Sequence, residues 1–312
     1  MKKEYEYAIV GGGPAGIVFY QELVKSHKTN IILFEKGNEL CSELSTYGLF
    51  VRNHEADEKT KWDFLVDGKH LGSGIADYFQ KGFNGVVQYS EIKQITKTEN
   101  IYQLATESGE VYKAENVVLA TGARLKQIDA IRRLPAQEFN ISSFSAEDLK
   151  KIDFSNHEII LIGSGDKTLL KAARVAKHIE EKYTQIPRGP ITIFVKNKFA
   201  DHANPDFVRD VESYVKKGTI QIIDNCWQIE EIKLNENNLV EKIISTDSQY
   251  QIKAPHGAYV GVFIGFEGRW PKLVNCSVED FICIGDLDLA LNKKKINIPG
   301  ALLSAEQRAK EI

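Results

Sequence analysis

The stretch Tyr5–Gly16 reads Tyr-Glu-Tyr-Ala-Ile-Val-Gly-Gly-Gly-Pro-Ala-Gly, and it predicts how the chain begins to fold. Its apolar run, Tyr7–Val10, is typical of a buried strand. The run breaks into glycines, and a helical pattern follows over Ile17–Ser26. This order of strand, glycine turn and helix is typical of a nucleotide-binding unit, because the helix N-terminus offers free N–H groups and a partial positive charge to phosphates.

Three of the glycines have the spacing Gly11-x-Gly13-x-x-Gly16. Gly11 permits a tight turn, Gly13 lacks the Cβ that would block a pyrophosphate, and Gly16 lets the helix pack closely on the strand. A second strand, Ile31–Phe34, ends on Glu35. This acid lies about 20 residues past the last glycine, where a carboxylate accepts hydrogen bonds from a ribose 2′-OH. Together these features predict a dinucleotide site.

The bulk composition narrows the class of protein. With 312 residues the chain is long enough for two domains, and its net charge of −3 gives no general footprint for nucleic acid or an anionic membrane. No apolar run approaches the ~20 residues of a membrane helix, and the N-terminus leads straight into the first strand without a signal peptide. We therefore expect a cytoplasmic protein with no nucleic-acid partner and no membrane insertion.

The four cysteines show neither a Cys-x-x-Cys pair nor metal-ligand spacing, and the histidines are scattered. Reduced thiols and no metal site are therefore expected. Cys226 and Cys283 lie in or beside predicted strands and are expected in the core.

The middle of the chain repeats its beginning. Short alternating strands over Gly85–Tyr112 predict a small antiparallel sheet inserted in the first domain, and the apolar strand Val117–Ala123 follows. Glu158–Ile162 then predicts another buried strand, Gly163-Ser164-Gly165 a second glycine turn, and Asp166–Glu181 an amphipathic helix. One chain therefore carries two nucleotide-binding units.

Four elements occur in a specific order: Gly11–Gly16, Ala120-Thr121-Gly122, Gly163-x-Gly165, and Gly285-Asp286 before a final helix over Gly300–Glu311. In this the chain resembles, over nearly its whole length, the two-domain flavoproteins of the thioredoxin reductase type, which include the thioredoxin reductase-like ferredoxin/flavodoxin–NADP reductases. The resemblance implies an α/β fold with two Rossmann-like, three-layer ββα domains. Residues 1–118 and 253–312 would form a discontinuous FAD-binding domain, and residues 119–252 an NAD(P)-binding domain.

The resemblance implies FAD in the first site. Glu35 would hold the adenosine ribose, the backbone near Ile92 the adenine, and Asp286 the ribityl chain. The helix from Gly300 would direct its N–H groups at the flavin and stabilise the negative charge of its reduced form. The implied FAD contacts are Gly11, Gly12, Gly13, Pro14, Ala15, Gly16, Glu35, Lys36, Glu43, Tyr47, Ile92, Ala120, Thr121, Gly122, Gly285, Asp286 and Ala301.

The second site would hold NADPH or NADH, but its motif is irregular, with Lys167 after Asp166 and Thr168 in the place of the third small residue. Two lysines could meet a 2′-phosphate only as point charges, without the planar fork of an arginine. No acid ends the strand Ile191–Val195 as a ribose partner of NAD, so both nucleotides stay open. The implied contacts are Gly163, Ser164, Gly165, Asp166, Lys167, Thr168, Lys196 and Lys198.

The chain departs from thioredoxin reductases in lacking their redox-active Cys-x-x-Cys: the corresponding stretch, Phe144–Leu149, contains no cysteine. In this stretch the chain resembles the ferredoxin-reductase branch, which also lacks the cysteine pair. Two interpretations of Cys41 stay open. It is either a small residue packed in the cofactor loop or a redox-active thiol whose pKa the flavin and a nearby helix N-terminus lower.

We therefore expect an enzyme, an FAD-dependent NAD(P)H oxidoreductase that passes electrons to an acceptor other than thioredoxin, with ferredoxin or flavodoxin favoured. Lys293–Lys295 could steer such an acidic protein or simply form a solvated loop. Alternatives are a single-cysteine disulfide reductase acting through Cys41, an NAD(P)H oxidase or quinone reductase, and, in another class, a flavin-binding sensor with a degenerate second site. Analogy suggests a homodimer.

Overall fold

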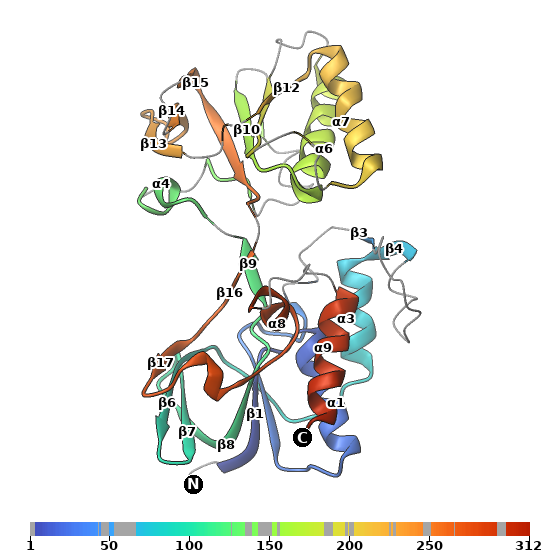
Figure 1. Cartoon of the computed structure of the whole chain (residues 1–312), viewed down its shortest axis with the longest axis vertical. Coiled ribbons are helices and arrows are strands. Elements are labelled where there is room, and N and C mark those ends of the chain that lie inside the picture. Colours follow the sequence, from blue (N-terminus) through green and yellow to red (C-terminus); the bar gives the residue numbers. More distant parts are fainter. Residues whose placement is uncertain are drawn as a thin grey trace. The chain divides into compact units, whose positions relative to one another are not determined.

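The computed structural model describes residues 4–42, 44, 50–52, 67–125, 127–134, 139–142, 152–154, 157–183, 190–196, 199, 203–224, 226, 229–245, 251–264, 266–291 and 298–312 (Figure 1). The chain divides into two compact units, Met1–Arg124 with Phe266–Ile312, and Leu125–Gly265.

The first unit contains a sheet in the order β17-β6-β7-β8-β1-β2-β5, with β18 also paired to β8. Strand β1 is central and runs parallel to β2 and β8, so that Tyr7 lies opposite Ile31 and Asn116. The bounds are β1 (Glu4–Val10), β2 (Ile31–Glu35), β5 (Val87–Tyr89), β6 (Ile92–Thr98), β7 (Ile101–Thr106), β8 (Val111–Leu119), β17 (Lys272–Val274) and β18 (Ile282–Cys283).

The antiparallel strands are not the separate inserted sheet that we predicted. Strand β8 is a single strand that pairs antiparallel with β7 and parallel with β1 and β18. The sequence indicated two strands there because the polar run Lys113–Asn116 interrupts the apolar pattern. The antiparallel strands therefore continue the parallel sheet.

Alternate side chains of the central strands are buried on opposite faces. Ile9 and Leu33 belong to one buried cluster, whereas Val10 and Phe34 belong to another. Burial on both faces explains why these strands read as continuous apolar runs.

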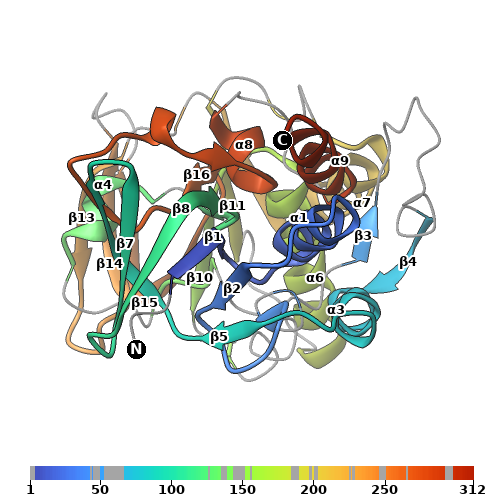
Figure 2. The ribbon, with the colours of Figure 1, turned by 90° about the horizontal axis from the view of Figure 1, so that it is seen from below.

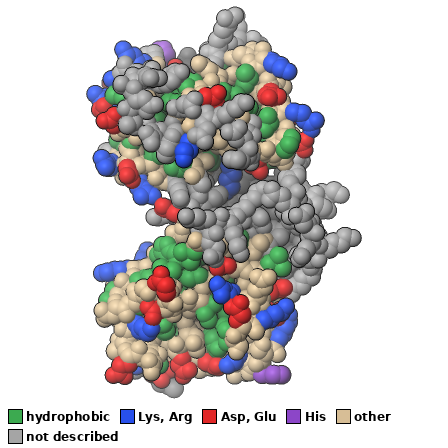
Figure 3. All heavy atoms as spheres, viewed as in Figure 1, with side chains coloured by type: hydrophobic (Ala, Val, Ile, Leu, Met, Phe, Trp, Pro, Cys, Tyr) green, Lys and Arg blue, Asp and Glu red, His purple; other side chains and the backbone are tan. Residues whose placement is uncertain are grey.

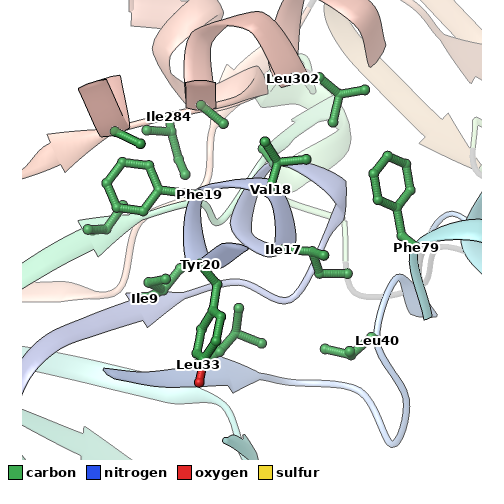
Figure 4. Close-up of a cluster of buried hydrophobic side chains, with 14 of the residues drawn as sticks. Ile9, Ile17, Val18, Phe19, Tyr20, Leu33, Leu40, Phe79, Ile284 and Leu302 are labelled. Atoms are coloured by element: carbon green, nitrogen blue, oxygen red, sulfur yellow. The ribbon is translucent and has the colours of Figure 1, made fainter. Parts of the chain in front are cut away.

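Among the described residues of this unit, the helices are α1 (Pro14–Lys25), α3 (Gly72–Lys81), α8 (Asp286–Leu291) and α9 (Ile298–Lys310). Helix α9 packs beside α1 (Figure 2). The close-up in Figure 4 shows α1 surrounded by apolar side chains from the strands, α3 and α9, among them Leu33, Phe79 and Leu302. The smaller elements are η2 (Val278–Asp280) and the hairpin of β3 (Phe50–Arg52) with β4 (Asp67–Leu71).

The second unit has a sheet in the order β12-β11-β10-β15-β14-β13. Strand β10 is parallel to its neighbours β11 and β15, whereas β13 and β14 form an antiparallel hairpin. The bounds are β10 (Glu158–Ile162), β11 (Ile191–Phe194), β12 (Ile220–Ile223), β13 (Ile229–Leu234), β14 (Val240–Ser245), β15 (Gln251–Val262), α4 (Asp129–Arg132), α6 (Asp166–Lys182) and α7 (Pro205–Lys217).

Both boundaries between the units lie later in the chain than predicted. The segment after β8 stays with the first unit because the Ala120 N–H donates to the Val10 carbonyl at 2.8 Å. Strand β15, which we assigned to the first domain from residue 253, lies between β10 and β14 in the second sheet. The two connecting segments pair with each other as β9 (Ala123–Leu125) and β16 (Phe266–Gly268).

Candidate nucleotide-binding sites

The first glycine turn joins β1 to α1 and is closely packed. Gly11 has a φ of +119°, and its N–H donates to the Phe34 carbonyl at 2.8 Å. A Cβ on Gly11 would lie 2.2 Å from the Ala120 carbonyl oxygen, and one on Gly16 would lie 2.0 Å from the Gly11 carbonyl oxygen. Because real Cβ atoms do not approach backbone this closely, only glycine fits at either position.

Gly13 is different, because a Cβ there would meet no atom of the described residues within 4 Å. It is the N-cap residue of α1, and no side chain of the described residues caps that helix. The first turn of α1 therefore presents N–H groups next to open space. This combination fits a pyrophosphate, which a helix N-terminus binds through its N–H groups and partial positive charge.

The Glu35 carboxylate is only 6% exposed and joins two segments. Its Oε2 accepts from the Gly12 N–H at 2.9 Å, and its Oε1 accepts from the Gly37 N–H at 2.8 Å and from Ser42 Oγ at 3.1 Å. Since a carboxylate offers about four acceptor positions, these three donors leave room for a ribose hydroxyl. The sequence did not indicate Ser42 as a partner of Glu35.

Gly285 brings three helices together. It has a φ of +69°, and a Cβ on it would lie 2.7 Å from the Cβ of Ala15 and 3.9 Å from the Cβ of Ala301. These alanines lie in the first turns of α1 and α9, and Asp286 begins α8. The neighbouring Thr121 Oγ1 donates to the Arg269 carbonyl at 2.5 Å, a contact that the sequence did not reveal.

The structure thus gathers most of the FAD residues implied by the resemblance at the carboxyl ends of β1, β2, β8 and β18. Ile92 lies apart, at the start of β6, with its side chain buried in the core, so only its backbone is available. Lys36 is exposed beside Glu35. Glu43 and Tyr47 lie outside the described residues, as do Phe144–Leu149, Lys198 and Lys293–Lys295.

A cavity of about 430 Å³ lies at the outer edge of β5. Glu39 and Leu40 from the loop after Glu35 line it, together with Gln80 of α3 and Tyr89 of β5. Tyr89 lies in register with Glu35. The sequence gave no sign of this cavity, because its walls come from segments far apart in the chain.

The Cys41 thiol is deeply buried. It is 3% exposed, and burial, together with the charges of Glu35 and Glu39, raises its pKa to about 12. Of the two interpretations of Cys41, this favours the packed loop residue, because desolvation is the largest effect on the thiol at this site. The Cys41 N–H donates to the Gly12 carbonyl at 2.9 Å, which is the contact of a packed loop residue.

Burial also raises the pKa of the Cys283 thiol, to about 11. The predictions that Cys226 and Cys283 lie in the core are confirmed.

The second glycine turn repeats the first. Gly163 has a φ of +128°, and a Cβ on it would lie 2.5 Å from the Phe263 carbonyl oxygen. Gly165 is the N-cap of α6, and a Cβ there would meet nothing within 4 Å. No side chain of the described residues caps α6, so this turn also presents an open helix N-terminus.

The irregular residues of this turn have distinct surroundings. Thr168 is fully buried, and its Oγ1 has no hydrogen-bond partner in the described part of the chain. Asp166 Oδ1 accepts from the N–H of Asn204 at 2.7 Å, which ties α6 to the start of α7. Lys196 is exposed directly after β11.

Among the described residues, no three His, Cys, Asp or Glu side chains converge as metal ligands. None of the described helices combines the length and the apolar character of a membrane span. On the face shown in Figure 3, acidic and basic side chains of the described residues are interspersed on each unit.

Comparisons with known proteins agree with this architecture. Residues 5–265 match the family described as "Pyridine nucleotide-disulphide oxidoreductase". The chain is similar to "Ferredoxin--NADP reductase 1" of Listeria innocua, with 24% identity over 309 residues that cover 95% of this chain and 82% of that protein. A protein of the same name from Bacillus thuringiensis is 28% identical over 177 residues, which cover 53% of this chain and 46% of the relative.

Two solved structures share the fold. Bacillithiol disulfide reductase from Staphylococcus aureus has a TM-score of 0.75 and 16% identity, covering 100% of this chain and 98% of that one. Thioredoxin reductase from Lactococcus lactis has a TM-score of 0.66 and 16% identity, covering 98% of this chain and 97% of that one. At such low sequence identity the structural similarity bears on the fold alone. It confirms the prediction of two Rossmann-like domains.

Proposed function

The chain belongs to the pyridine nucleotide-disulphide oxidoreductase family, and from this premise we propose that it is an FAD-dependent NAD(P)H oxidoreductase whose electron acceptor is not thioredoxin. FAD and NAD(P)H are the cofactors with which this family works. We assign FAD to the first unit and NADPH or NADH to the second. Bound FAD supplies the chemistry, since it takes a hydride from reduced nicotinamide and gives electrons to an acceptor.

One observation carries the proposal: the chain has two glycine turns of the same design. In each, the first glycine is packed against backbone at positive φ, and the glycine two residues later, Gly13 or Gly165, caps a helix beside open space. Two open helix N-termini on two sheets are what an enzyme needs to bind two dinucleotides. A single-nucleotide protein needs only one.

The residues of the first unit have separate tasks. The first turn of α1 holds the pyrophosphate, and the remaining acceptor position of Glu35 takes a ribose hydroxyl. The first turn of α9 begins beside Gly285 and directs its N–H groups and partial positive charge toward the flavin end. These groups orient the cofactor and tune its electronics.

Two observations bear on the acceptor. The sequence has no Cys-x-x-Cys pair, and the Cys41 thiol, with a pKa of about 12, stays protonated at neutral pH. Both disfavour a thiol relay, including the single-cysteine disulfide reductase. The names of the similar ferredoxin–NADP reductases support a ferredoxin or flavodoxin, with a quinone or O₂ as the other acceptors. The proposal includes a homodimer in the cytoplasm; sedimentation analysis tests the dimer, and cell fractionation tests the location.

A second candidate is a flavin-binding sensor that no longer binds nicotinamide nucleotides. Thr168 favours it, because a buried hydroxyl in place of the third small residue changes the packing of α6 behind the turn. The open N-cap at Gly165 favours the enzyme.

Anaerobic mixing of the purified protein with NADPH and with NADH, while the flavin absorbance near 450 nm is followed, separates these functions. The enzyme predicts rapid bleaching by at least one nucleotide. Bleaching by dithionite but by neither nucleotide would support the sensor. Absence of a flavin after loading with FAD would contradict both.

A further inference from the structure

A buried polar contact joins α8 to α9 behind the FAD site. The Asp288 side chain of α8 accepts a hydrogen bond at its Oδ2 from Ser304 Oγ of α9, at 2.7 Å. Asp288 is 8% exposed and Ser304 is 6% exposed, so water does not compete freely for this bond. The Arg308 guanidinium lies 3.8 Å from the other oxygen, Oδ1.

Ser304 and Arg308 are four residues apart and therefore lie on the same face of α9. A single carboxylate of α8 thus holds two successive turns of α9. Helix α9 also makes apolar contacts, with Leu302, Ala305 and Ala309 packed in the core of the first unit. Apolar packing is not directional, whereas a charge-assisted hydrogen bond fixes one register of the two helices.

The contact lies close in sequence to two residues of the site. Asp288 is two residues after Asp286, and Ser304 is three residues, or about one turn, after Ala301. Gly285, the residue just before α8, lies close to Ala301 of α9, as described above. Any sliding of α8 along α9 would therefore change the spacing between Asp286 and the first turn of α9.

We propose that Asp288 is a positioning residue for the flavin end of the FAD site, acting through Ser304. This inference rests on the proposed function, since it concerns how the first unit holds FAD. The carboxylate does not touch the cofactor; it sets the register of α8 and α9, whose first turns hold the ribityl chain and face the flavin.

The test uses full-length protein stripped of FAD and titrated with FAD under fluorescence, with the flavin midpoint potential measured on the reloaded protein. Asp288→Ala is expected to weaken FAD binding at least tenfold and to shift the potential. Ser304→Ala removes only the directional bond and should produce a smaller loss of the same kind. Asp288→Asn keeps an oxygen that accepts from Ser304 and should restore most of the affinity.

Asp280→Asn provides a matched control in the same unit. Asp280 accepts from the Ser277 N–H at 2.8 Å and also pairs with Lys97, and neither Asp280 nor Lys97 is among the residues assigned to FAD. This variant should leave FAD affinity and potential unchanged even if the melting temperature falls.

The outcomes are distinct. If wild-type protein binds FAD and the Asp288 and Ser304 variants lower only the melting temperature, with unchanged FAD affinity and potential, the positioning role is overturned while the proposed function stands. If Asp288→Ala does not fold, the comparison rests on Ser304→Ala and Asp288→Asn. If wild-type protein does not bind FAD, both proposals are overturned.

Discussion

The Gly12 N–H donates a hydrogen bond of 2.9 Å to the Glu35 carboxylate, and this bond ties the first glycine turn to the end of β2. Glu35 therefore has two roles. It accepts three hydrogen bonds within the chain, and it keeps an acceptor position that we assign to a ribose hydroxyl. The residue that would bind the ribose also shapes the turn that would bind the pyrophosphate.

Glu35→Gln is expected to lower the free energy of unfolding of the FAD-free protein by about 2 kcal/mol. The neutral amide weakens three charge-assisted bonds and turns an NH₂ group toward at least one N–H or O–H donor. Urea denaturation measures the change. Glu91→Gln is the control. The Glu91 carboxylate pairs with Lys93 on the exposed surface, so loss of this ion pair should have little effect on the free energy of unfolding. Equal stability of both variants would contradict the structural role of Glu35.

Gly13→Val and Gly16→Ala should fail in opposite ways. The new side chain at position 13 enters open space, at a φ of −76° that any residue adopts, so the protein folds but FAD affinity falls at least 100-fold. The Cβ at position 16 would lie 2.0 Å from the Gly11 carbonyl oxygen, so that variant should lose its folded structure. Circular dichroism and FAD titration distinguish them. Tight FAD binding by Gly13→Val would place the pyrophosphate elsewhere.

Cys41 makes stability depend on pH in the alkaline range. Its pKa in the folded protein, about 12, lies above the ordinary value of 9.0, so the folded state keeps the proton longer than the unfolded state. The stabilisation that the buried, protonated Cys41 thiol gives to the folded state is complete below pH 9. It is lost as pH rises toward 12, at about 1.4 kcal/mol per pH unit. Comparing urea denaturation of wild type and Cys41→Ser at pH 8 and 10.5 should show the steeper loss in the wild type.

The same burial predicts that Cys41 has no redox role. Turnover with any acceptor should be within about twofold of wild type in Cys41→Ser, since a thiol with this pKa has almost no thiolate at neutral pH. Iodoacetamide should label Cys41 only after unfolding. Lost disulfide reduction with intact flavin reduction in Cys41→Ser would contradict this assignment.

Thr168→Val should stabilise the protein by about 1 kcal/mol. Valine has the same shape, and it removes a fully buried hydroxyl that has no hydrogen-bond partner among the described residues. Thr219→Val is the matched control, because the Thr219 Oγ1 donates to Glu180 at 3.1 Å and its loss should destabilise. Thermal melting measures both. A destabilised Thr168→Val would mean that the hydroxyl has a partner, such as a buried water.

The sequence predicted those parts of the site that depend on local geometry. Glycine spacing predicted the two turns because backbone segments can approach so closely only where a residue has no Cβ, as at Gly11 and Gly163. Apolar runs predicted the strands, since each central strand is buried on both faces.

Contacts between distant segments could not be predicted in this way. The Ser42–Glu35 and Ser304–Asp288 bonds, and the meeting of Ala15, Gly285 and Ala301, depend on how elements pack in three dimensions. The sequence also left two interpretations of Cys41 open, because the raised pKa follows from burial, which the spacing of residues does not reveal. Strand β15 was misassigned because its apolar pattern does not say which sheet it joins.

The most direct test of the central claim, that the two open glycine turns bind two dinucleotides, is anaerobic stopped-flow reduction of Gly165→Val beside the wild type. A Cβ at position 165 meets nothing within 4 Å, so the variant should fold and retain FAD. The account predicts that NADPH or NADH bleaches the wild-type flavin rapidly, whereas the variant is bleached only by dithionite. Equal rates with nucleotide in both proteins would contradict the account, because the second turn would then not hold the hydride donor.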